Sequence, residues 1–327
     1  MESSPTAVCV GETMAALLPD RPGPLEDVAA FRSAIGGAEA NVARGLVAFG
    51  VPAAWIGRVG ADGFGRRVVR ELAAGGIDTS AVTVDAERPT GLYVKETGPQ
   101  GSVLHYYRDG SAGSALGPGL LDGPGPAAAM LTRARLVHLS GITAALSDGA
   151  LALVRALLER PRPPGQAVSF DLNWRPALWR RRDPAVLRAL LDAADIVLLG
   201  ADEAAEALGT GDPEGLRALL PGPATIVVKD DARRASAVDR DGPPVSEPAL
   251  SVDVVERVGA GDAFAAGYLA GTLRGYDRRR CLRLGHLAAA ATLVVHGDHG
   301  PPPAPERVEK LLAAAPEEWA ATRVGAG

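Results

Sequence analysis

Cysteine is scarce in this chain, and the few histidines do not cluster with it at zinc-site spacing. The 327 residues include two cysteines and five histidines. Cys9 falls in a predicted strand and Cys281 in a predicted helix, so we expect two reduced thiols, as is usual in a cytoplasm. A disulfide framework and a structural zinc module, which needs several closely spaced ligands, are both disfavoured.

Long apolar runs and a strong charge of one sign are also missing. A membrane helix needs about 20 consecutive apolar residues, and no such run occurs. The first five residues lack the basic and apolar regions of a secretory signal. The net charge of −5 gives no basic footprint for nucleic acid, and the arginine runs at 180–182 and 278–280 fit solvated helix faces. We expect a cytoplasmic protein that binds neither membrane nor nucleic acid.

The order of predicted elements indicates an α/β fold with a mostly parallel central sheet flanked by helices. With 47% hydrophobic residues the chain can bury a large core. Strands alternate with helices, which is typical of parallel βαβ units. Strands are predicted at 7–11, 53–57, 136–140, 167–171, 196–199 and 224–229, and antiparallel ones at 235–240 and 245–250. Helices are predicted at 35–49, 62–74, 260–274, 278–296 and 305–313, and from about 148.

A predicted hairpin interrupts this alternation. Residues 90–95 and 102–108 have strand character and are joined by Gly-Pro-Gln-Gly at 98–101. Tyr93, Tyr106 and Arg108 can project to one face, because positions 106 and 108 share strand parity. Two hydroxyls and a guanidinium there would suit a polyhydroxylated acid. The alternative is an ordinary half-exposed sheet face.

Two glycine-containing stretches precede predicted helices. Gly259 and Gly261 flank Ala260 and lead into Asp262, where backbone amides and the helix dipole would favour an anion. A carboxylate beside such amides suggests a base next to a transferring group. A tight glycine turn followed by an Asp that caps the helix would explain the same sequence. Gly36 and Gly37 expose amides at an earlier helix, with Asn41 one turn in. That stretch is equally compatible with a plain glycine turn.

These segments make the chain similar to the ribokinase-like (PfkB) carbohydrate kinases over nearly its whole length. Residues 36–43 resemble the amino-terminal signature of that family, and residues 258–264 resemble its carboxy-terminal signature. Two signatures in order are more specific than either alone, and no P-loop motif is present. The resemblance implies one ribokinase-like domain over 1–327, with β-sheet lid elements inserted near 12–34 and 88–110.

The resemblance also implies a reaction and its residues. It implies phosphoryl transfer from ATP, with Mg²⁺, to a sugar hydroxyl. Asp262 would be the base, and the amides of Gly259, Ala260 and Gly261 would hold the transferring group. Lys229 would lie on the nucleotide side, and Glu203 would contact the metal through water.

Within that family, three segments resemble kinases of 2-keto-3-deoxygluconate. They are residues 88–93, residues 106–112, and the polar stretch 171–179 that follows a strand. Two arginines suit the carboxylate of a sugar acid, which a neutral sugar lacks. The substrate contacts implied by the resemblance are Gly36, Gly37, Asn41, Tyr93, Tyr106, Arg108 and Arg175.

Three departures from the family pattern stand out. Residues 256–258 are Glu-Arg-Val where the family often has Asp-Thr-Thr, which leaves monovalent-cation activation open. Glu203 lacks the Asn that usually precedes it. Loop 230–234 carries charges where glycines are usual, and Asp231 would repel phosphates unless Arg233 or Arg234 offsets it. We interpret this loop as a reshaped surface turn rather than a change in nucleotide binding.

Two other functions remain open. One is a kinase of the same fold for a neutral sugar or nucleoside, such as fructose, ribose or adenosine. The other is a non-catalytic sensor of sugars or nucleotides, which fold alone does not exclude. The exposed edges of the predicted lid sheet could also pair in a homo-oligomer.

Overall fold

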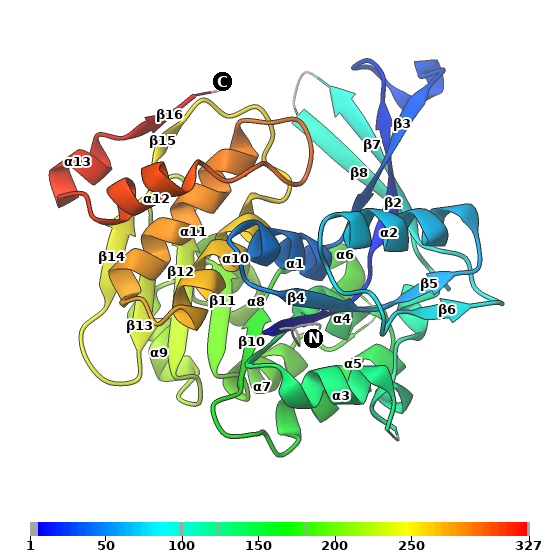
Figure 1. Cartoon of the computed structure of the whole chain (residues 1–327), viewed down its shortest axis with the longest axis horizontal. Coiled ribbons are helices and arrows are strands. Elements are labelled where there is room, and N and C mark those ends of the chain that lie inside the picture. The colour runs from blue at the N-terminus through cyan, green and yellow to red at the C-terminus, as the bar shows by residue number, and fades with distance from the viewer. Residues whose placement is uncertain (1–5, 99–100, 123, 181, 326–327) are drawn as a thin grey trace.

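An eight-stranded sheet forms the centre of the computed structural model, which describes residues 6–98, 101–122, 124–180 and 182–325 (Figure 1). Neighbouring strands from β12 to β4 are parallel. Strand β13 pairs antiparallel with β12, and β14 pairs antiparallel with β13. Their order across the sheet is β14 (Val245–Pro248), β13 (Arg234–Asp239), β12 (Thr225–Asp230), β11 (Ile196–Gly200), β10 (Ala167–Asp171), β9 (Leu136–Ser140), β1 (Ala7–Val10) and β4 (Ala53–Ile56).

Strand parity divides the core into two layers. Ala7 and Cys9 of β1 face one cluster and Val8 and Val10 face the other, because successive side chains of a strand point to opposite faces. The first cluster packs against α1 (Ala38–Ala48), α2 (Gly63–Ala74), α10 (Ala260–Leu273), α11 (Arg278–Leu293), α12 (Pro305–Leu312) and α13 (Pro316–Ala320). The second packs against α3 (Pro126–Arg133), α4 (Gly141–Leu146), α5 (Asp148–Glu159), α6 (Pro176–Trp179), α7 (Val186–Asp192), α8 (Ala201–Leu208) and α9 (Pro213–Leu219).

A separate four-stranded sheet stands over one end of the central sheet (Figure 1). We call it the lid sheet, and its order is β3 (Phe31–Gly36), β2 (Met14–Pro19), β7 (Leu92–Gly98) and β8 (Gly101–Tyr107). Two small parallel pairs complete the strands: β5 (Arg58–Gly60) with β6 (Thr83–Asp85), and β15 (Ser251–Val252) with β16 (Arg323–Val324). At the open edge strand β8, Val103 and Tyr107 are exposed. Pairing of two lid sheets across a dimer stays a prediction.

The α/β class with a mostly parallel sheet is confirmed, and most element bounds agree within a residue or two. The prediction of a helix from residue 35 was wrong, because Ile35 and Gly36 end β3 and the helix begins at Ala38. The helix expected to reach residue 296 ends at Leu293. Cys9 and Cys281 are buried and unpaired, as expected. In the predicted hairpin turn, Pro99 and Gln100 lie outside the described residues.

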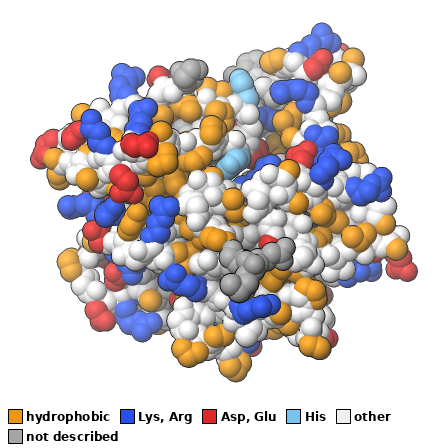
Figure 2. All heavy atoms as spheres, viewed as in Figure 1, with side chains coloured by type: hydrophobic (Ala, Val, Ile, Leu, Met, Phe, Trp, Pro, Cys, Tyr) orange, Lys and Arg blue, Asp and Glu red, His pale blue; other side chains and the backbone are white. Residues whose placement is uncertain are grey.

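On the face drawn in Figure 2, lysines and arginines are interspersed with aspartates and glutamates rather than gathered into one basic patch. Within the described ranges no helix combines the length and the apolar content needed to cross a membrane.

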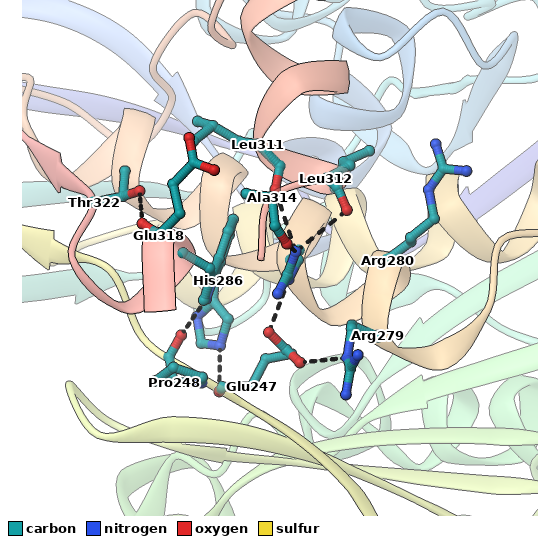
Figure 3. A network of polar contacts seen from close by, with 12 residues as sticks. Glu247, Pro248, Arg279, Arg280, His286, Leu311, Leu312, Ala314, Glu318 and Thr322 are labelled. Atoms are coloured by element: carbon teal, nitrogen blue, oxygen red, sulfur yellow. Dashed lines mark hydrogen bonds and ion pairs between the residues drawn. The ribbon is translucent and has the colours of Figure 1, made fainter. Parts of the chain in front are cut away.

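A buried ion pair fastens the carboxy-terminal helices to the central sheet (Figure 3). Arg283 of α11 is 1% exposed; its Nε donates to Glu247 Oε2 of β14 at 2.8 Å. Its Nη1 donates to the Ala314 carbonyl at 2.6 Å, and also points at the carbonyls of Leu311 and Leu312 at the end of α12. Arg279, whose side chain is 56% exposed, pairs with the other Glu247 oxygen. Only the first of these two arginines is therefore enclosed with its partner.

We expect Arg283→Leu to lower the free energy of unfolding by about 3 kcal/mol, because it strips a buried carboxylate of its main partner and uncaps α12. Arg279→Ala should cost less than about 1 kcal/mol, because the Arg279 side chain is mostly exposed and Glu247 keeps its buried partner Arg283. Urea denaturation followed by circular dichroism measures both. Equal losses for the two variants would contradict this reading of the pair.

Candidate functional site

A cavity of about 420 Å³ lies between the lid sheet and the carboxyl ends of the central strands. Ligands of open α/β sheets bind at this edge, because the loops that follow the strands converge there. Of the predicted site residues, all but Ala260 line this cavity: Gly36, Gly37, Asn41, Tyr93, Tyr106, Arg108, Arg175, Glu203, Lys229, Gly259, Gly261 and Asp262. Ala260 lines a second cavity next to it.

The lid sheet contributes a pair of tyrosines. Tyr93 of β7 lies directly opposite Tyr106 of β8, and their ring centroids are 5.8 Å apart. The Tyr93 hydroxyl donates to Asp298 Oδ2 at 2.8 Å, and a Cβ on Gly36 would overlap that hydroxyl. Burial raises the pKa of Asp298. Sequence reasoning missed this carboxyl, which lies in an irregular loop with no motif around it.

Arg108 reaches the cavity already paired. It follows β8, and its Nε donates to Glu12 Oε2 at 2.8 Å, with a second contact from Nη2. Both side chains are buried, at 8% and 1% exposure, and Ser111 donates to the other Glu12 oxygen. Glu12 was not predicted as a site residue; its only signal is its place just after the buried strand β1. The Glu12 carboxylate thus fixes the orientation of the Arg108 guanidinium.

Arg175 enters from the other side of the cavity. It is the N-cap residue of α6, and its Nη1 donates to the carbonyl of Trp174 at 2.8 Å and to Glu203 Oε1 at 3.1 Å. The side chain is 47% exposed, so it keeps contact with the open cavity. The cavity therefore has a cationic group from the lid and one from the sheet edge.

Asp262 occupies the first turn of α10, and amides from two other elements hold its oxygens. Asn41 of α1 donates to Oδ2 at 2.9 Å, and Asn173, which follows β10, donates to Oδ1 at 3.3 Å. Burial raises the pKa of Asp262 to about 7, the hydrogen bond from Asn41 opposes that rise, and the nearby Asp171 charge adds to it. A carboxyl with that pKa can accept a proton near neutral pH. The role of Asn173 was not predicted, although its segment was.

The glycine loop before Asp262 is shaped by a close backbone contact. Gly259 has φ 81°, in the left-handed region, and caps α10. A Cβ there would overlap the carbonyl oxygen of Asp298. No side chain of the described residues caps this helix, and the Ala260 amide makes only a long contact, 3.4 Å, with the Arg257 carbonyl, so the helix start can receive an anion.

Lys229 lies between the two cavities near the end of β12 and lines both. Its Nζ is 3.1 Å from Asp171 Oδ2. Burial lowers the pKa of Lys229, but the charges of Asp171 and Glu203 outweigh that effect and the pKa is raised. The ammonium is therefore charged at neutral pH.

The second cavity has a volume of about 390 Å³ and a largely apolar wall. Leu250, Phe264 and Leu293 line it, which suits a flat ring system. It joins the first cavity at shared residues: Glu203, Lys229, Arg257 and Gly261. The wall residues come from separate elements and formed no motif, so the sequence did not reveal them.

Loop 230–234 differs from the expectation in one respect. Arg233 pairs with Asp230, at 2.9 Å from its Nε. The arginine that faces Asp231 is Arg257, with Nη1 3.9 Å from Oδ1. Among the described residues neither Arg233 nor Arg234 forms an ion pair with Asp231, so Arg257 is the arginine that the structure places against that carboxylate.

The part of the chain that the structure describes holds no group of three metal-ligating side chains. A divalent ion at this site would therefore need most of its ligands from a bound phosphate chain and water. Mg²⁺ is commonly coordinated in this way. Glu203, whose side chain is 29% exposed where the cavities meet, is suitably placed to contact such an ion through water.

Comparison with known proteins decides the family. The model of the pfkB family carbohydrate kinases matches residues 4–305. The chain belongs to this family. A 2-dehydro-3-deoxygluconokinase of Thermoproteus tenax is 38% identical over 325 residues, covering 96% of each chain. A 2-dehydro-3-deoxygluconokinase of Bacillus subtilis is 31% identical, covering 94% of this chain and 95% of the relative.

Solved structures agree. A PfkB protein from Polaromonas sp. JS666 is 34% identical, with a TM-score of 0.79 over 94% of this chain and 99% of that one. A 2-dehydro-3-deoxygluconokinase from Thermotoga maritima, 24% identical, has a TM-score of 0.85 over 95% and 99% and shows the same fold. The predicted resemblance to the ribokinase-like carbohydrate kinases is confirmed, and this pfkB-family protein is a carbohydrate kinase.

We expect the Asp262 carboxyl to titrate near pH 7 and to titrate at still higher pH in Asn41→Ala, because the Asn41 hydrogen bond favours the charged form. Carboxyl-carbon NMR of protein labelled at aspartate measures both values. Asn173→Ala is the matched comparison and should shift the titration less, since its contact is longer. An Asp262 that titrates near pH 4 would contradict the burial argument.

Proposed function

We propose that this protein phosphorylates 2-dehydro-3-deoxygluconate or a closely similar keto-deoxy sugar acid, with ATP as donor. The observation that carries the proposal is the position of Asp262. It lines the cavity that holds Arg108 and Arg175, and it directly follows Gly261, which lines that cavity and the cavity with an apolar wall. A sugar acid fits the first and a nucleotide the second. The relatives named above, both 2-dehydro-3-deoxygluconokinases, support the choice of acid.

The chemistry follows from the geometry at that junction. Asp262 accepts the proton of the attacking hydroxyl, and Asn41 and Asn173 fix the direction of its carboxylate. The amides of Gly259 to Gly261 receive the negative charge of the transferring phosphoryl group. Lys229, which lines both cavities, contacts the phosphate chain. Alignment and charge stabilisation are what phosphoryl transfer mainly requires of a protein.

Mg²⁺ is part of the proposal as a companion of the nucleotide. Glu203 would hold the ion through water, and the ion would supply positive charge to the phosphates. The lid sheet covers the acid: Tyr93, Tyr106 and Asp298 bind its hydroxyls, while Arg108 and Arg175 bind its carboxylate. Gly36 and Gly37 let the backbone approach the sugar closely. A neutral sugar would offer these two arginines no carboxylate to bind.

In an ATP-consumption assay we expect kcat/KM for 2-dehydro-3-deoxygluconate to exceed that for fructose, ribose or adenosine by about 100-fold or more. The reason is that charged hydrogen bonds to the carboxylate contribute about 1.5–3 kcal/mol each. Asp262→Asn should lower kcat by about 10²–10⁴-fold while the acid still binds. Turnover of a neutral sugar at the same efficiency would favour the alternative kinase. Binding of both ligands by the wild type without turnover would favour a sensor.

The arginines separate a sugar acid from its neutral analogue. We expect Arg175→Ala to raise KM for the acid by about 10- to 100-fold and to leave an analogue whose carboxylate is reduced to an alcohol unaffected. Arg108→Ala also leaves Glu12 buried without its cation, so the matched variant is Arg108→Ala with Glu12→Gln. Steady-state kinetics on both substrates measures the split. An unchanged KM for the acid in all these variants would refute the sugar-acid assignment.

A further inference from the structure

Arg257 lies where the two cavities meet. It lines both of them, together with Glu203, Lys229 and Gly261. It also stands directly before Val258 and the glycine loop whose amides point at the same place. A group that spans the two cavities passes among these four residues.

The other cations at this junction are already engaged. Lys229 is 3.1 Å from Asp171, and Arg175 is 3.1 Å from Glu203. The guanidinium of Arg257 is 77% exposed, and its ion-pair partner Asp231 is 3.9 Å away. An exposed pair at that distance contributes little free energy. Of the two cations that line both cavities, Lys229 and Arg257, Arg257 is therefore the one that can more easily turn to a new anionic partner.

The backbone beneath Arg257 is held in place. Glu256 Oε1 accepts the amide of Arg257 at 3.0 Å and that of Val258 at 3.4 Å. The other Glu256 oxygen forms an ion pair with Lys95 of β7 in the lid sheet, and both side chains are largely buried. The backbone of Arg257 is thus fixed against the glycine loop and the lid sheet, while its exposed guanidinium is free to move.

Asp231 is the counterpart on the nucleotide side. It sits in the turn between β12 and β13 with φ 42°, a left-handed conformation that favours glycine, and it lines the second cavity. Its side chain is 68% exposed. The carboxylates of Asp171, Glu203 and Asp262 lie nearby, so an incoming phosphate chain meets several negative charges. Such a site needs a cation that is not already neutralised.

We propose that Arg257 binds the phosphate chain of the nucleotide where it passes between the two cavities, and that Asp231 is the partner it exchanges for phosphate. This inference rests on the proposed function and adds a specific residue to it. In the absence of nucleotide the guanidinium is only loosely paired with Asp231. When phosphates arrive, the guanidinium turns to them and forms forked, charge-assisted hydrogen bonds. The charged loop at 230–234 is then part of nucleotide selection rather than a reshaped surface turn.

Calorimetric titration of the full chain with adenosine, ADP and ATP tests the proposal. We expect Arg257→Gln to weaken ATP binding by about 10- to 100-fold and ADP binding less, with adenosine binding unchanged. Arg257→Lys should restore part of the loss. Asp231→Asn, the matched control on the other side of the pair, should tighten ATP binding because it removes a competing anion. Thermal unfolding should be unchanged in all three, since both side chains are exposed.

The outcomes are separable. Equal ATP affinity of the wild type and Arg257→Gln would overturn the role of Arg257 and leave the kinase proposal standing. The same loss for adenosine as for ATP would overturn it too, because the effect would then be one of cavity shape. A wild type that binds no ATP at all would overturn this inference and the proposed function together. In kinetics, the variant should raise KM for ATP and not for the sugar acid.

Discussion

The carboxylate of Asp262 at the positive end of α10 is the constraint on which the site depends. A helix start attracts an anion, and here the chain supplies one of its own while leaving the neighbouring amides for another. Two asparagine amides, from α1 and from the segment after β10, hold the carboxylate in one orientation. Burial raises its pKa to about 7, so the carboxylate can take up a proton near neutral pH.

The lid sheet belongs to the same arrangement through two cross-links. Tyr93 donates to Asp298, whose carbonyl group packs on Gly259, and Lys95 pairs with Glu256 just before the glycine loop. A movement of β7 would therefore be felt at the loop that faces the nucleotide cavity. The lid and the phosphoryl-binding loop are mechanically connected by these contacts, although they lie far apart in the sequence.

Much of this could be predicted because the signals were local. Buried strands such as 136–140 and 167–171 are short apolar runs between helical patterns. The glycine loop is a short motif whose glycines let backbone amides approach an anion. The strands β2 and β3 were harder, because their region is rich in proline and β2 pairs with β7 of a distant hairpin, where Ala15 lies opposite Leu92. Asp298 and the apolar wall of the second cavity carried no signal, since they come from loops and helices that meet only after folding.

The sequence by itself determined the α/β class, the family resemblance and the two sides of the reaction site, because these depend on periodicity and on short motifs. Tertiary structure alone decided how the charges are paired. Arg108 forms an ion pair with Glu12, Arg175 with Glu203 and Lys229 with Asp171, whereas Arg257 is only loosely paired with Asp231. The pairing depends on distances between side chains from separate elements, and a charge in a sequence does not indicate which opposite charge will lie a few ångströms from it.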